Sequence, residues 1–171
     1  RARLSWERPI PVVPSPERGW RMRAGLHVAG RGPRLTLGFL GAGGQRVVDT
    51  PDCLHLAPET HALLAGLRAE LTTQPDLAGR IERVELAESL DGAQRVVALR
   101  GRLGPRDTQR GARWVGALPG LTGVGLVTTE ARRGRFLEAA GDVHVQAAIG
   151  GATLRSHVLS FFQGNRHLVA A

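Results

Sequence analysis

The 171-residue sequence lacks lysine and tyrosine altogether and has a single cysteine and a single methionine. One cysteine excludes the disulfide-stabilised scaffolds of small secreted proteins. No apolar run approaches the roughly 18 residues of a membrane-spanning helix, and no charged start followed by an apolar stretch marks a signal peptide. These absences predict a soluble, cytoplasmic protein with no membrane partner.

Acidic residues are scarce relative to basic ones. Twenty-three basic side chains, all of them arginine, face 15 acidic ones, which gives a net charge of +8 and a sequence pI of about 11.5. Arginine binds phosphate through a planar fork of N–H donors, so this excess favours a polyanionic partner such as a nucleic acid. A coding bias toward arginine is the alternative, and it would leave a structural domain without a ligand.

Aromatic residues are also few, three Trp and four Phe, yet two of them are adjacent in the C-terminal segment Leu159–Val169. There the pair Phe161–Phe162 is followed closely by Gln163 and Asn165. A phenyl ring can stack on a nucleobase, and side-chain amides can hydrogen-bond to base edges or to ribose. The alternative is a last strand or helix start whose Phe pair fills the core, the ordinary place for phenylalanine.

The hydrophobic pattern predicts an α+β fold. Alternating or apolar runs predict strands at residues 20–28, 35–39, 45–48, 83–88, 95–100, 123–129, 143–146 and 152–158. A leucine stripe predicts a helix at residues 57–74, and a second helix is expected at 105–118 with Trp114, Val115 and Leu118 buried. Short Gly-rich turns indicate largely antiparallel sheet with two main helices packed on one face, in the order β-β-β-α-β-β-α-β-β-β.

Four arginines are candidate RNA contacts. In the strand predicted at residues 20–28, Arg21 and Arg23 alternate with apolar residues and therefore point to the outer face. If this strand forms a hairpin with the next one, Arg34 can share that face, and Arg46 is counted with them. An ordinary solvated sheet face explains the same pattern. The basic stretch 131–135 is expected to be a solvated turn or an RNA contact.

Two further motifs are not expected to form a phosphate-binding or metal site. Gly41–Gly44 has the composition of a phosphate-binding loop, but such a loop needs a helix behind it, and a strand is predicted here instead. A flexible hairpin loop is therefore expected. Cys53, His55 and His61 lack the spacing of a zinc site, so no metal site is predicted and Cys53 is expected to be a buried free thiol.

The C-terminal segment resembles the F-F-Q-x-N segment of the S-adenosylmethionine-dependent RNA uracil-5-methyltransferases. Two more stretches resemble segments of the same family in the same order. Residues 14–24 are similar to its "PSP..GYRNRAR" strand, and residues 37–53 to its "GF…VVDI..C" segment. Together these matches span nearly the whole chain, although Gly164 stands where the family usually has a bulkier apolar residue.

This resemblance implies the central, RNA-engaging domain of such an enzyme, which would act on ribosomal or transfer RNA. It divides the chain into an extended lead-in (1–19), the domain itself (20–158) and a linker (159–171) into a methyltransferase domain that this chain lacks. The family's catalytic Cys and Glu and its S-adenosylmethionine site lie in that further domain. The chain alone is therefore expected to have no catalytic residue, no bound cofactor and no activity.

The resemblance also implies roles for single residues. It places Phe161 near the target base, and Gln163 and Asn165 against the base or the cofactor. Cys53 matches the position of a family ligand to an iron–sulfur cluster, but the other three cysteine ligands are absent, so no cluster is expected. A free-standing nucleic-acid-binding module without enzymatic activity is the alternative function.

Overall fold

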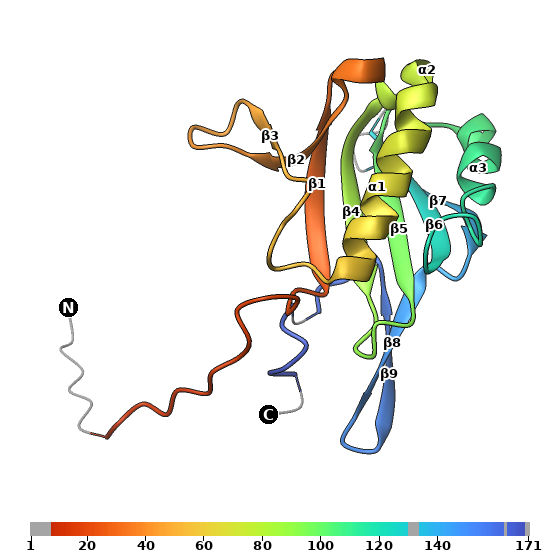
Figure 1. Cartoon of the computed structure of the whole chain (residues 1–171). Coiled ribbons are helices and arrows are strands. Elements are labelled where there is room, and N and C mark those ends of the chain that lie inside the picture. Colours follow the sequence, from red (N-terminus) through yellow and green to blue (C-terminus); the bar gives the residue numbers. More distant parts are fainter. Residues whose placement is uncertain (1–7, 130–133, 163, 170–171) are drawn as a thin grey trace, which may run out of the picture.

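The computed structural model describes residues 8–129, 134–162 and 164–169, with only the backbone of residues 138 and 139. Seven strands form one sheet in the order β3-β2-β1-β4-β5-β6-β7, and β8 and β9 form a separate two-stranded sheet (Figure 1). The elements are β1 (Arg23–Ala29), η1 (Gly32–Arg34), β2 (Thr36–Leu40), β3 (Val47–Asp49), α1 (Pro58–Thr73), α2 (Pro75–Ala78), β4 (Ile81–Glu88), β5 (Arg95–Gly101), α3 (Pro105–Ala112), β6 (Leu121–Thr128), β7 (Arg135–Gly141), β8 (His144–Ile149) and β9 (Ala152–His157).

Neighbouring strands of the large sheet are antiparallel except for one pair. β5 and β6 are parallel, because the chain crosses over through α3 between them. The α+β class predicted from the sequence, with mostly antiparallel strands and few helices, is confirmed.

Helix α1 forms the main core with one face of the sheet. Its leucine stripe is buried, and it packs on apolar residues that alternate along β1, β4, β5 and β6, among them Leu26, Val84, Leu99 and Leu126. Each fully buried leucine contributes roughly 1.5–3 kcal/mol relative to an exposed one. No helix in the described part of the chain is long and apolar enough to cross a membrane.

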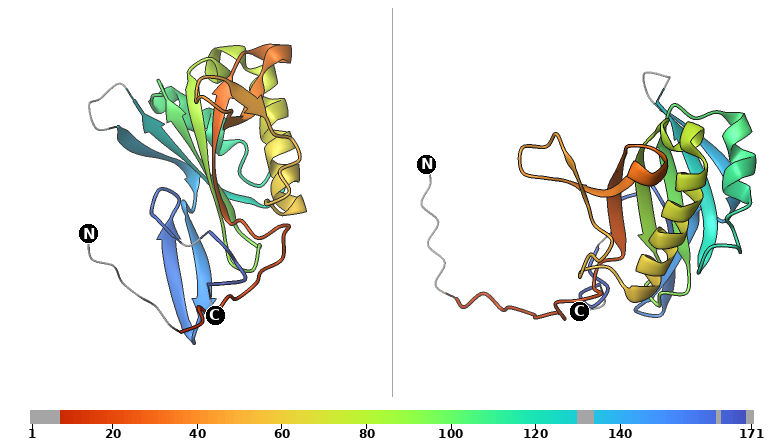
Figure 2. Two further views of the ribbon diagram at one scale, coloured as in Figure 1. Left: turned by 90° about the vertical axis from the view of Figure 1, so that its left-hand side faces the viewer. Right: turned by 45° about the horizontal axis from the view of Figure 1, so that its top comes forward.

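The other face of the sheet is covered only in part, by the β8–β9 hairpin. Ala87, Val96 and Ala98 from the sheet form a second, smaller apolar cluster with Val145 of β8 and neighbouring residues. Figure 2 (left) shows α1 against one face of the sheet and the hairpin extending below the opposite side. The hairpin predicted around Gly150–Gly151 is therefore present and forms its own small layer.

The first predicted helix is confirmed, but the second was predicted too long. Helix α3 ends at Ala112, and Arg113 to Leu118 form turns instead. Gly116 adopts a φ of 79°, a left-handed conformation that a helix does not contain. Trp114 is nevertheless buried as predicted, and its indole N–H donates to the Glu70 carboxylate at 3.1 Å.

The pattern analysis missed strand β7. Arg135 was assigned to a basic loop at residues 131–135, but it begins this strand; residues 131–133 lie outside the described part of the chain. Leu137, Glu138 and Ala139 have no strand preference, so the segment carries no strong local signal. Its pairing with β6, for example Val127 with Phe136, decides its conformation.

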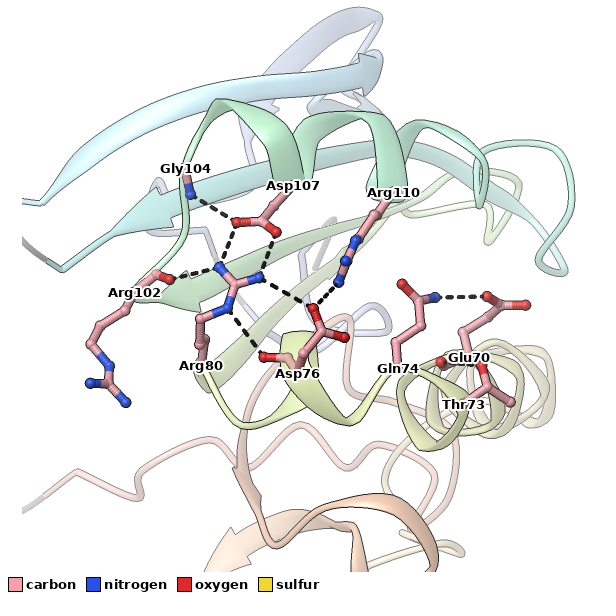
Figure 3. A network of polar contacts seen from close by, with 9 residues as sticks. All are labelled: Glu70, Thr73, Gln74, Asp76, Arg80, Arg102, Gly104, Asp107 and Arg110. Atoms are coloured by element: carbon pink, nitrogen blue, oxygen red, sulfur yellow. Dashed lines mark hydrogen bonds and ion pairs between the residues drawn. The ribbon is translucent and has the colours of Figure 1, made fainter.

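A polar network ties α2, α3 and the start of β4 together (Figure 3). Arg80 donates to both carboxylate oxygens of Asp107, at 2.8 and 2.7 Å, and to the carbonyl oxygens of Asp76 and Arg102. Asp107 also accepts from the backbone N–H of Gly104 at 2.9 Å and so caps α3. These contacts, chiefly the Arg80 guanidinium, hold the pKa of Asp107 below its ordinary value.

Asp107→Asn should therefore make folding less sensitive to acid. Because the pKa is lowered in the folded state, the carboxylate stabilises the fold above its ordinary pKa, and this contribution is lost as pH falls through the lowered value. We expect the variant to lose about 1–3 kcal/mol of unfolding free energy at pH 7. The difference from wild type should shrink below about pH 4. Urea denaturation across this pH range measures it.

Asp52→Asn is the matched control, since Asp52 is exposed and has no ion pair within the described residues. It should leave the unfolding free energy within about 0.5 kcal/mol of wild type. A difference between wild type and Asp107→Asn that stayed constant with pH would show that the carboxylate charge has no part in the stabilisation.

Candidate nucleic-acid interface

The two terminal segments cross beside the start of β1, and we call this region the crossing site. It comprises Trp20–Met22, the described residues of the C-terminal segment (159–162 and 164–169) and the loop at Leu54–His55. Met22 N–H donates to the Gly164 carbonyl at 2.8 Å, and Arg166 N–H donates to the Trp20 carbonyl at 3.0 Å. On the other side, Arg21 N–H donates to the His55 carbonyl at 2.8 Å. Figure 1 shows both terminal segments meeting below β1.

A buried carboxylate holds the C-terminal segment on the sheet. The Glu88 side chain, at the end of β4, is fully buried and accepts from Arg95 at 2.7 Å and from Arg166 at 2.5 Å. Arg95 is itself buried and also donates to the Thr60 hydroxyl of α1 at 3.3 Å. Two arginines thus pair with one buried carboxylate, which would be costly to bury without either of them.

Phe161 is not part of the core. Its side chain is 94% exposed, whereas Leu159 packs against the smaller apolar cluster. The alternative in which the Phe pair fills the core therefore does not hold for Phe161. An exposed phenyl ring beside a segment fixed by hydrogen bonds is open to a planar ligand.

Asn165 is engaged within the protein, and Gln163 lies outside the described residues. The Asn165 side-chain amide donates to the Ser15 hydroxyl at 2.9 Å and accepts from the His167 N–H at 3.0 Å. Asn165 also forms an isolated antiparallel bridge with Arg21. In this structure Asn165 therefore joins the two terminal segments.

A pocket of about 520 Å³ opens at the crossing site. Its apolar and aromatic walls include Trp20 and Leu54, and the rings of Trp20 and His55 lie 5.1 Å apart. The Arg21 guanidinium lies 5.0 Å from the centre of the Trp20 ring, in the range of a cation–π contact. The remaining lining residues are Ser15, Pro16, Glu17, Arg18, His55 and Asn165.

The sequence analysis missed Trp20 and His55 as site residues. Trp20 was assigned to the buried side of a strand, and His55 was considered only as a metal ligand. Trp20 stands just before the first strand, but no local pattern connects it with His55. The two rings are close because hydrogen bonds join Gly19 and Arg21 to the 54–55 loop.

The four candidate arginines do not lie on one patch. Arg21 is at the crossing site, and Arg23 turns its guanidinium to the Val158 carbonyl, where burial lowers its pKa. Arg34 lies in η1, beyond the opposite end of β1, because the hairpin pairs Ala29 with Thr36 and leaves Arg34 in the connection. Arg46 is exposed in the loop between β2 and β3, the hairpin loop expected around Gly41–Gly44.

Cys53 is partly buried against the main core and makes no disulfide. The ring of His61 contacts the Cys53 carbonyl through Nε2 at 2.8 Å, while His55 turns to Trp20. Among the described residues, no three His, Cys, Asp or Glu side chains converge as a metal site. The expectation that the chain carries no iron–sulfur cluster stays a prediction.

Arg166→Met should release the C-terminal segment without unfolding the sheet. Glu88 would keep Arg95 as its partner, so we expect local opening of the crossing site. The amide of Met22, which bonds to Gly164, should then exchange hydrogen at least tenfold faster, while amides between β4 and β5 keep their protection. Arg155→Met is the control, because Arg155 is an exposed arginine paired with Asp142. Unchanged exchange at Met22 would show that Arg166 does not hold the segment.

Comparison with known proteins supports the fold. No protein-family model matches this chain, and no curated protein sequence does either. Among solved structures, it is similar to Pyrococcus abyssi tRNA (uracil-54, C5)-methyltransferase in complex with S-adenosyl-L-homocysteine, with a TM-score of 0.66 and 17% sequence identity. The similarity covers 91% of this chain and 39% of that enzyme. At this identity the two proteins share a fold, and this chain spans well under half of the enzyme's length.

Proposed function

We propose that this chain is the RNA-binding central domain of an S-adenosylmethionine-dependent RNA uracil-C5 methyltransferase, which acts on ribosomal or transfer RNA. The observation that carries this proposal is the fold likeness to the tRNA (uracil-54, C5)-methyltransferase over 91% of the chain. The three stretches that resemble that family, which run in the family's order, and the net charge of +8 support it independently of the fold.

In this function, RNA binding belongs to this chain and methyl transfer to a further domain. In this proposal residues 1–19 are the lead-in, residues 20–158 engage RNA, and residues 159–171 lead into a methyltransferase domain. That domain would bind S-adenosylmethionine, which supplies the methyl group, and would carry the nucleophilic Cys and the general base. This chain alone is then inactive, and it contributes RNA binding and one wall of the site.

At the crossing site, each part has a separate task. The exposed Phe161 ring offers a face on which a base can stack, and Arg21, whose guanidinium lies over the Trp20 ring, offers a charge for phosphate. Asn165 ties the lead-in to the C-terminal segment, and the Glu88–Arg166 ion pair anchors that segment to β4. The protein thereby holds a stacking surface in place before RNA arrives, so less ordering entropy is lost on binding.

The alternative function is a free-standing nucleic-acid-binding module without enzymatic activity. It is favoured by the way both terminal segments are fixed onto the domain through contacts within this chain. The coding sequence on either side of this segment in its gene separates the two functions. A downstream glycine-rich cofactor loop followed by Cys and Glu would support the methyltransferase, and their absence would support the module.

Phe161→Ala should weaken RNA binding without destabilising the protein. Stacking of one base on an aromatic ring is worth about 1–3 kcal/mol, so we expect an affinity for single-stranded, uridine-rich RNA about tenfold lower. Fluorescence anisotropy with labelled RNA measures this. The melting temperature should hardly change, because the ring is 94% exposed.

Leu154→Ala is the matched control, since Leu154 is another exposed apolar side chain, 47% exposed on β9. It should leave RNA affinity unchanged. Equal losses in both variants would mean that exposed apolar surface, and not the Phe161 ring, contributes to binding. No RNA binding by the wild-type chain at any salt concentration would contradict the proposed function itself.

Gln163 should matter in the intact enzyme. An amide presents a donor and an acceptor that match the uracil O4 and N3–H pattern, and a base must leave its stack to be modified. Gln163→Ala in the full-length protein should lower methyl transfer from labelled donor at least tenfold. In this chain alone the same change should alter unfolding free energy by no more than about 0.5 kcal/mol. Wild-type methyl transfer by the variant would remove Gln163 from the site.

A further inference from the structure

Six arginines gather at the end of the sheet farthest from the crossing site. We call them the arginine rim. They come from the β1–β2, α2–β4 and β5–α3 connections and from helix α3 itself, and they are Arg31, Arg34, Arg80, Arg102, Arg106 and Arg110. Two open pockets, of about 560 and 660 Å³, lie along the rim. Gly79 lines the first and Arg80 the second, so the pockets adjoin at the α2–β4 connection.

Carboxylates balance only part of this charge. Asp76 and Asp107 are the two acidic side chains of the rim in the described structure, and they pair with Arg80 and Arg110. The other four arginines have no ion pair within the described residues, and all four are exposed. In Figure 3 the guanidinium of Arg102 points away from the network. The rim therefore has a surplus of four positive charges, half the net charge of the whole chain.

The rim is held in shape by its own contacts. Arg80 is fixed by Asp107 and by the Asp76 and Arg102 carbonyls, and Arg110 reaches Asp76 at 2.7 Å. Across the α2–β4 connection, the Arg31 guanidinium lies against Gly79, where an added Cβ would come within 2.1 Å of Arg31 Nε. At the start of α3, the Asp107 carboxylate already accepts from the backbone N–H of Gly104, so that N–H is not available to a ligand.

Strand β4 separates the rim from the crossing site. It begins beside Arg80 and ends at Glu88, which anchors the C-terminal segment. Eight residues of strand span roughly 25 Å. A dinucleotide or trinucleotide is shorter than this distance even when its backbone is extended. A short oligonucleotide reaches one of them, and a folded RNA reaches both.

We propose that the arginine rim is a second RNA-contact surface, which binds the phosphodiester backbone of the same RNA whose base is held at the crossing site. This inference rests on the proposed function for the identity of the ligand. The guanidinium fork donates two parallel hydrogen bonds to a phosphate and keeps its charge at all physiological pH values. Backbone contacts of this kind fix the register of an RNA without reading its sequence. The rim would therefore select for RNA length and shape.

The test compares two labelled RNAs on the intact chain, a 3-nucleotide uridine-rich strand and a 24-nucleotide hairpin. Arg102→Gln combined with Arg106→Gln should lower the hairpin affinity about tenfold and reduce the slope of log affinity against log salt by about 2, one for each lost phosphate contact. The affinity for the short strand should change less than twofold. Arg31→Gln combined with Arg34→Gln, on the other flank, should have the same effect.

Arg113→Gln combined with Arg155→Gln is the matched control, because it removes the same charge from exposed arginines outside the rim. An equal loss of hairpin affinity in this control, or an unchanged affinity in both rim variants, would overturn the inference. So would an equal loss of affinity for polyglutamate, since the rim would then be a docking surface for acidic proteins. If the wild-type chain binds neither RNA, the proposed function fails as well. If it binds both and the rim variants keep wild-type affinity for the hairpin, the inference alone fails.

Discussion

The arrangement of this protein depends on one buried carboxylate. The Glu88 carboxylate forms ion pairs with Arg95 of β5 and with Arg166 of the C-terminal segment. Arg95 also donates a hydrogen bond to the Thr60 hydroxyl of α1. A lone buried carboxylate would cost several kcal/mol, and the ion pairs with Arg95 and Arg166 offset this cost. The ion pairs join elements far apart in the chain at one end of the sheet, and they fix the segment that presents Phe161 to solvent.

The two ends of the sheet differ in chemistry. One end combines an exposed phenyl ring, a Trp–His pair and an arginine on an aromatic face, which suits an unstacked base. The other end carries the arginine rim, which suits phosphate groups. Strand β4 lies between the two ends, so under the proposed function its length sets the size of RNA that can contact both.

Local structure was predictable from the sequence where one physical interaction dominates it. The leucine stripe predicted a helix at residues 57–74, and α1 runs from Pro58 to Thr73. Helix α3 was predicted too long because Trp114 and Leu118 keep a helical spacing of apolar residues beyond the true end, at Ala112. Strand β7 was missed because its residues have little strand preference and rely on pairing with β6.

By itself the sequence determined the α+β class, the excess of arginine and the concentration of aromatic and amide residues near the C-terminus, since composition and periodicity carry that information. Only the tertiary structure decided which of these residues meet. It separated Arg34 from Arg21, turned Arg23 to a backbone carbonyl, and brought Ser15, Trp20, His55 and Asn165 together. Such contacts depend on strand register and on ion pairs between distant segments, neither of which leaves a local pattern in the chain.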